Sequence, residues 1–416
     1  MFSRQIKRVL VFLCLAVFIL FAITHLTSSR NSCSYYNSVE MFNQDAADNC
    51  IGAHASRYSN KAIFKVDTFN DYAIVTLLQD ITLSEPLVLE RTVLNLNTFT
   101  LHGTDTQLLY IVGEAKVHNG VLEQINLNSS EPAINIHMNA CANISDLTIL
   151  VNGTDSAIGI LNYGSLELSQ SVIEVRSTTI STMSSTIGIS TGICSDTIIS
   201  KTQIQAEAPE GFVEGLRTKN NTTVIDSTIS TYANYRSNSK MFLSCAVGCN
   251  SSGNLLLDNC KVFGVHSGVN AAGSLDITGG IYSGYGHGGI YCTGVHKTFI
   301  VRNATIQQDL LPSGFIDFGP GSTKAALYIG GGKDRCYNTV ILQNCILYAD
   351  KNAIVLRGSS GETNNTLYLY SCILDKKYLR VDNPTHKIFA DAACDITSAN
   401  VSIPETFNLI NNKILS

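Results

Sequence analysis

The sequence predicts an all-β protein built as a right-handed parallel β-helix, a solenoid of about eleven coils with three strands per coil. Three observations predict it. A short pattern of alternating apolar residues returns along most of the chain, the segments that carry it lack helical periodicity, and one bend in each repeat holds a small side chain. One N-terminal signal-anchor or transmembrane helix is expected to precede this body.

The repeat has two apolar residues two apart, a polar or small stretch, and a further apolar residue. Its period of two and its β-branched residues are typical of a strand, a tight bend and a second strand. Successive copies start 20 to 41 residues apart, which favours coils joined by loops of different length. The eleven copies begin at Leu94, Ala115, Ala142, Leu166, Thr197, Thr223, Leu255, Leu275, Phe299, Val340 and Leu367.

A third short apolar strand lies between many of these copies. It is seen at residues 133–136, 157–160, 187–189, 289–291, 327–329 and 353–356. Stacked coils pair each strand in parallel with its equivalent in the next coil and bury every second side chain. At about 4.8 Å per coil, eleven coils would form a rod roughly 50 Å long.

The bend between the first two strands is expected to point a small side chain into the core. Its sixth position holds Gly120, Ser171, Thr202, Thr228, Cys260, Gly280, Ala304, Cys345 and Cys372, whereas Phe99 and Leu147 break the rule. A buried free cysteine behaves as a small hydrophobe. We therefore expect Cys345 and Cys372 to stack as thiols, and the pattern supplies no convergent ligands for a metal.

Residues 74–78, 81–83 and 94–103 resemble the first coil of the pectin-lyase-like right-handed β-helix proteins. The resemblance is to a fold family and covers roughly residues 74 to 374. It implies three parallel sheets with loops projecting along one side. The β-helix would then occupy residues 74–377, with residues 31–73 as an N-terminal leading and capping segment and residues 378–416 as a C-terminal cap.

The first thirty residues differ from the rest of the chain. Arg4, Lys7 and Arg8 form a basic flank before an apolar run over residues 9–26. The run lies between the length of a signal-peptide core and that of a membrane span. We favour a retained single-pass anchor in residues 1–30, with the basic flank in the cytoplasm and the body outside. The alternative is cleavage of a signal peptide followed by secretion.

The cysteines and the charges add two expectations. An exported chain can form disulfides, and Cys33 and Cys50 flank the leading segment, so that a bridge between them is an open alternative to free thiols. The chain has 28 basic and 33 acidic residues, a formal net charge of −5, and no basic cluster interleaved with aromatics. We therefore do not expect a nucleic-acid partner.

Several β-helix families are polysaccharide lyases or glycoside hydrolases. The string Gly286-His287-Gly288 is similar to a short motif of polygalacturonase-like hydrolases, whose other motifs have no counterpart here, and a glycine-rich turn between coils explains the string as well. By register, His266 and His287 fall in equivalent turns of consecutive coils, followed by Asp309 and Asp350. Such a column could bind a cation or act on a sugar, or be a row of ordinary solvated turns.

The longest interval between copies follows the one at Phe299, and long insertions on a regular scaffold often carry function. Phe315 and Phe318 could stack on a sugar ring, Asp317 could bind its hydroxyls, and Lys333 could contact an acidic glycan. A packed surface loop is the other interpretation.

A catalytic role, if there is one, would use His287, Asp309, Asp317 and Arg335. We expect no cofactor or bound metal, except Ca²⁺ if the chain is a lyase.

We therefore expect a surface protein that is carbohydrate-binding or adhesin-like, with an extracellular polysaccharide or glycan as its partner and the membrane contacted through the N-terminal segment. A pectin-lyase-like polysaccharide lyase or glycoside hydrolase is one alternative, and a purely structural surface protein is another. The scaffold alone does not choose among them, because one fold hosts unrelated functions.

Overall fold

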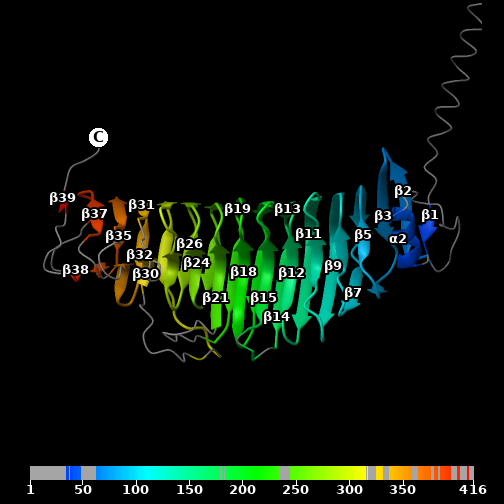
Figure 1. Cartoon of the computed structure of the whole chain (residues 1–416), viewed down its shortest axis with the longest axis horizontal. Helices are drawn as coiled ribbons and strands as arrows, with labels where there is room; N and C mark the ends of the chain where they lie inside the picture. Colours follow the sequence, from blue (N-terminus) through cyan, green and yellow to red (C-terminus); the bar gives the residue numbers. More distant parts are fainter. Residues whose placement is uncertain are drawn as a thin grey trace, which may run out of the picture.

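The computed structural model is a parallel β-helix, as the sequence predicted. It describes residues 34–36, 38–47, 62–178, 180–181, 183–234, 244–314, 316, 325–330, 337–357, 364–375, 379–382, 385–394, 401–402 and 410–411. The coils stack along the long axis of the molecule, from β3 near one end to β37 near the other (Figure 1).

Each coil contributes a strand to three parallel ladders. Ladder 1 contains β3 (Tyr72–Leu77), β6 (Thr92–Asn95), β9 (Glu114–Asn126), β11 (Cys141–Gly153), β13 (Ser165–Ser169), β16 (Asp196–Ser200), β19 (Thr222–Ile225), β22 (Leu255–Asp258), β25 (Leu275–Thr278), β28 (Thr298–Arg302), β31 (Thr339–Gln343), β34 (Thr366–Tyr370), β37 (Lys387–Ala390) and β39 (Ile410–Asn411). Strands β9 and β11 are long enough to continue round the bend into ladder 2.

Ladder 2 contains β4 (Ile81–Leu83), β7 (Thr100–Thr104), the second halves of β9 and β11, β14 (Val172–Ser177), β17 (Gln203–Glu207), β20 (Thr228–Tyr232), β23 (Lys261–Gly264), β26 (Ile281–Gly284), β29 (Thr305–Gln308), β32 (Ile346–Tyr348) and β35 (Ile373–Leu374). Ladder 3 contains β5 (Leu87–Leu89), β8 (Leu109–Ile111), β10 (Pro132–Ile136), β12 (Ala157–Asn162), β15 (Ser185–Thr191), β18 (Gly211–Thr218), β21 (Ser244–Ser251), β24 (Ser267–Ala271), β27 (Gly288–Cys292), β30 (Ala325–Ile329), β33 (Asn352–Leu356), β36 (Leu379–Val381) and β38 (Val401–Ser402).

The parallel pairing extends beyond the eleven copies seen in the sequence. Ladder 3 has 13 strands among the described residues, because β5 precedes the first copy and β38 follows the last. Strands β36 to β39 also continue the ladders in parallel past residue 377. The eleven copies did not include these end strands because they are short or depart from the repeat pattern.

The bend between ladders 1 and 2 is made by one residue with a left-handed backbone in most coils. Asn and Asp are the residues that best tolerate this conformation after glycine. The positions with positive φ are Asn119, Asp146, Gln170, Lys201, Asp226, Asn259, Gly279, Asn303, Asn344 and Ser371. The next residue points inward, so the predicted corner position is right in nearly every coil.

One corner assignment is wrong by one residue. Asp226 takes the left-handed position, and Ser227 is therefore the buried corner residue, while Thr228 is exposed. A one-residue shift reverses the face of a strand residue, and the sequence offers two small polar residues side by side at this bend.

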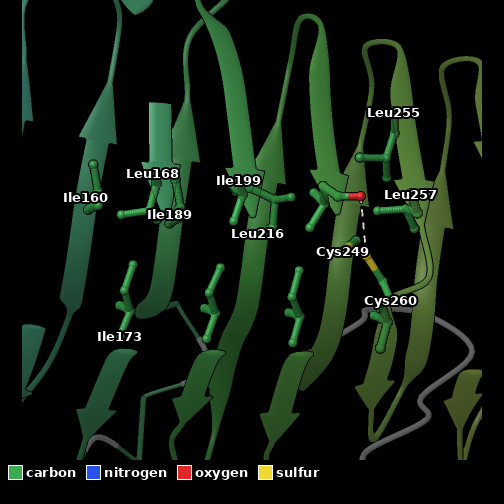
Figure 2. Packing of buried hydrophobic residues seen from close by; sticks show 14 of the residues in the cluster. Ile160, Leu168, Ile173, Ile189, Ile199, Leu216, Cys249, Leu255, Leu257 and Cys260 are labelled. Atoms are coloured by element: carbon green, nitrogen blue, oxygen red, sulfur yellow. Dashed lines mark hydrogen bonds between the residues drawn. The ribbon is translucent and has the colours of Figure 1, made fainter. Parts of the chain in front are cut away.

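The interior consists of columns of side chains in register from coil to coil. Ile160, Ile189, Leu216 and Cys249 of ladder 3 form one such column, and Ile173 lies among the side chains that face it (Figure 2). All five are fully buried. Burial at roughly 25 cal/mol per Å² of apolar surface, repeated in each coil, is the main source of stability of such a solenoid.

Ladder 3 carries a row of glycines that sequence reasoning did not use. Gly159, Gly188, Gly215, Gly248 and Gly268 occupy equivalent places in consecutive coils. A β-carbon on Gly215 would stand 2.3 Å from Ile229 Cγ2 of ladder 2. The two ladders approach too closely here for any side chain.

The leading segment covers the end of the first coil. Strands β1 (Ser34–Tyr36) and β2 (Phe64–Phe69) pair antiparallel with each other, and β2 pairs antiparallel with β3. Helix α2 (Val39–Ala47) contacts β5, where Asn43 accepts a bond from Val88 N at 3.0 Å and donates to Pro86 O at 2.7 Å. These bonds satisfy one backbone N–H of β5, the end strand of ladder 3, and the carbonyl just before it.

In the part of the chain that the structure describes, we find no helix of the length and apolarity that a membrane crossing needs. The predicted anchor at residues 1–30 lies outside the described residues.

Candidate functional site

The long insertion after β29 folds back over earlier coils. Its described part comprises residues 309–314 and Ile316. Leu311 packs against a buried apolar cluster that includes Ala206, Ala233 and Tyr285. The backbone N–H of Ile316 donates to Asn234 Oδ1 at 3.1 Å, across 82 residues of sequence. The insertion is therefore fixed beside the end of β20.

A groove lies between this insertion and ladder 2. It has a volume of about 580 Å³ and is lined by Asn152, Arg176, Ser177, Thr178, Glu207, Pro209, Asn234, Ser313 and Gly314. Asn152 on β11, Arg176 on β14 and Glu207 on β17 are direct register neighbours, so three successive coils each place one polar side chain along its floor. A rigid ladder fixes the spacing of these groups.

The groove walls suit a ligand rich in hydroxyl groups. Arg176 Nη2 lies 3.3 Å from Glu174 Oε2, and its side chain remains about half exposed. Amide, guanidinium and carboxylate groups together donate to and accept from hydroxyls. Tyr232 is the register neighbour of Glu207, and its ring centroid lies 5.4 Å from that of Phe263, which adds half-buried aromatic surface beside the groove.

A second cluster lies on ladder 3, where His287 meets three other rings. Its ring centroid is 4.5 Å from that of His266, 4.8 Å from that of Tyr291 and 5.0 Å from that of Tyr328. Tyr291 and Tyr328 are register neighbours with centroids 4.8 Å apart. The Tyr328 hydroxyl accepts a bond of 3.0 Å from Arg357 Nη1.

Burial sets the protonation of this cluster. It lowers the pKa of His266 to about 4. The pKa of His287 is held well below its usual range, first by burial and then by the adjacent His266 and Arg357. Burial also raises the pKa of Tyr328. Near neutral pH the two imidazoles are therefore uncharged, and Arg357 carries the positive charge of the cluster.

The structure brings together only some of the predicted site residues. His266 and His287 adjoin, as the register argument predicted. The Asp309 carboxylate accepts a bond from Leu310 N at 2.9 Å, and the Asp350 backbone N–H donates to Gln308 Oε1 at 3.2 Å. Whether these two carboxylates complete a column with the imidazoles stays a prediction.

Several predicted residues cannot be placed. Phe315, Asp317, Phe318, Lys333 and Arg335 lie outside the described residues, and so do Cys33 and Cys50.

The cysteines at the bend behave as predicted. Cys345 and Cys372 are free and buried, and Cys394 continues their column, with its Sγ accepting a bond from Cys372 N at 3.1 Å. Among the residues the structure describes, no three His, Cys, Asp or Glu side chains gather in a way that could hold a metal ion.

Sequence reasoning missed Arg176, Glu207 and Arg357. A signal for the first two was present, since both occupy outward positions of the period-two pattern in consecutive coils. Arg357 directly follows β33, and nothing in its neighbourhood along the sequence pointed to Tyr328, 29 residues earlier.

Comparison with known proteins does not assign this chain to a family. No protein-family model and no curated protein matches the chain significantly. Among solved structures, the crystal structure of the Dettilon tailspike protein aligns at 14% sequence identity with a TM-score of 0.48, over 71% of this chain and 63% of the tailspike chain. The matched part is thus less than two thirds of the tailspike chain.

Proposed function

We propose that this chain is an exported surface protein that binds an extracellular polysaccharide or glycan in the groove between ladder 2 and the folded-back insertion. The observation that carries the proposal is the fixed row of Asn152, Arg176 and Glu207 beneath Ser313 and Gly314. Successive coils repeat such groups at about 4.8 Å, close to the length of one sugar ring, so an extended saccharide can cross several coils.

Export supports an extracellular ligand. The basic flank at Arg4, Lys7 and Arg8 and the apolar run that follows favour a retained anchor, with the β-helix outside the cytoplasm. Fractionation of expressing cells tests this, since an anchored protein sediments with membranes after a high-salt wash and keeps its N-terminal peptide. A culture medium that holds a chain shortened by about thirty residues would instead identify signal cleavage.

The binding function is tested by incubating the purified protein with a polysaccharide panel and following both bound and released sugar, with and without Ca²⁺. Retention of at least one polysaccharide without cleavage is expected. Release of unsaturated or reducing ends would replace the binding proposal with a lyase or a hydrolase. No interaction with any member would favour a purely structural protein.

A further inference from the structure

The outer face of ladder 3 near its C-terminal end carries a cationic side chain with a fixed position. The guanidinium of Arg357 is exposed and donates one hydrogen bond, from Nη1 to the buried Tyr328 hydroxyl. Arginine has five N–H donors, so this bond orients the group and leaves most of its donors directed to the surface.

The nearby acidic group is already engaged. The Asp382 carboxylate is held by Arg380 through two contacts, of 2.8 Å from Nε and 3.4 Å from Nη2. The hydrogen bond to Tyr328 raises the pKa of Arg357, and the charge of Asp382 raises it further. Among the described residues, Arg357 makes no ion pair of its own. Within the part of the chain that the structure describes, the two guanidiniums and one carboxylate therefore leave one net positive charge beside the aromatic cluster.

Among the described residues, the aromatic neighbours add no charge near neutral pH. His266 and His287 are uncharged, and the phenol of Tyr328 is protonated because burial raises its pKa. Tyr291 is half-buried and presents part of its ring next to Tyr328. A ligand with a carboxylate on a ring could bind the guanidinium through the carboxylate and the aromatic surface through the ring.

We propose that Arg357, Tyr328 and Tyr291 form a second ligand site, separate from the groove, which takes the carboxylate of an acidic sugar. The carboxylate lies on the free N–H edge of Arg357, Tyr328 fixes that guanidinium, and the sugar ring rests against Tyr291. The site rests on ladder 3, whereas the groove is built on ladder 2, so the two can be disabled independently.

The test uses a glucuronic-acid-containing tetrasaccharide and its methyl ester, which keeps the rings and removes the charge. Titration calorimetry of the full-length protein in detergent is expected to show binding of the acid, weakened by added salt, and at least tenfold weaker binding of the ester. Arg357→Gln should weaken binding of the acid about tenfold, and Arg357→Lys should weaken it less, since the charge remains while the planar fork is lost.

Tyr328→Phe separates positioning from folding. It removes only the hydroxyl that orients Arg357, and it should weaken binding of the acid severalfold while leaving the thermal unfolding midpoint within a few degrees. Arg302→Gln, at a partly exposed arginine on ladder 1, is the control and should leave the affinity unchanged. Bound acid should also shift the ring signals of His287 in the NMR spectrum.

Three outcomes would overturn the proposal. The first is equal affinity for the acid and its ester, and the second is an affinity for the acid that Arg357→Gln does not change. The third is loss of acid binding in Arg176→Gln but not in Arg357→Gln, which would place the acidic sugar in the groove. Failure of the groove proposal would be a separate result, in which no polysaccharide of the panel binds more weakly to Arg176→Gln than to the wild-type protein.

Discussion

The imidazoles of His266 and His287 meet edge to face, one coil apart on the outer side of ladder 3, with ring centroids 4.5 Å apart and an interplanar angle of 82°. Both are neutral in the folded protein because burial opposes their charged forms. This contact lies between equivalent turns of two consecutive coils. Because both imidazoles are buried in neutral form, the stability of the fold should depend on pH at this point.

Stability should fall as the pH drops from about 6.5 to about 4. His266 has a folded pKa of about 4, below its unfolded value, so the unfolded chain binds more protons in this window and acid favours unfolding. The loss from this one group should reach roughly 2 kcal/mol at pH 5. Urea unfolding at pH 7 and pH 5 measures it, and His266→Gln should flatten the dependence.

The control for that experiment is His296→Gln, at an exposed histidine. It should keep the wild-type pH dependence. A wild-type protein equally stable at both pH values would show that His266 accepts a proton as easily when folded as when unfolded, contrary to the account.

The Ser171 hydroxyl at the bend should stabilise the fold chiefly by accepting one backbone hydrogen bond. Ser171 Oγ accepts from Leu147 N at 3.2 Å and donates to Ser169 O at 2.7 Å, in a buried corner. Ser171→Ala leaves that N–H without an acceptor and should cost about 1–3 kcal/mol of unfolding free energy. Ser171→Cys should cost clearly less, because Cys260 donates to the equivalent carbonyl in its own coil.

Chemical denaturation of the two variants decides this prediction. Equal destabilisation by Ala and Cys would mean that side-chain volume, rather than the hydrogen bond, sets the residue at this corner.

The glycine row should not tolerate a methyl group. Gly215→Ala would place a β-carbon 2.3 Å from Ile229 Cγ2, and the resulting overlap should cost about 1–3 kcal/mol. Ile229→Ala removes the opposing methyl group, so the double variant should be more stable than the sum of the single changes allows. Strict additivity in a double-mutant cycle would contradict close contact between these two residues.

The fold was largely predictable because each coil of a solenoid repeats the same pattern of apolar and small residues in the sequence. Alternation at Leu94 or Val340 marks which side chains enter the core, and small corner residues mark the bends. Ser227 shows the limit of this reading, since two adjacent small residues fit the same bend and only the backbone geometry separates them.

The candidate sites were harder to predict, because they join residues from different coils. Arg176 and Glu207 become neighbours only once the register is known, and Ile316 reaches Asn234 by folding back over several coils. The approach of Arg357 to Tyr328 likewise depends on where strands β30 and β33 end, which the repeat pattern does not specify.

The most direct test of the central claim is a titration of the groove with the polysaccharide fragment that the panel selects. Arg176→Gln removes a charged donor from the groove floor, and it should weaken binding about tenfold, the value of one charged hydrogen bond. Arg302→Gln removes a partly exposed arginine, paired with Asp276 on ladder 1, and should leave affinity unchanged. Equal affinity for wild type and Arg176→Gln, with both proteins folded, would contradict binding in this groove.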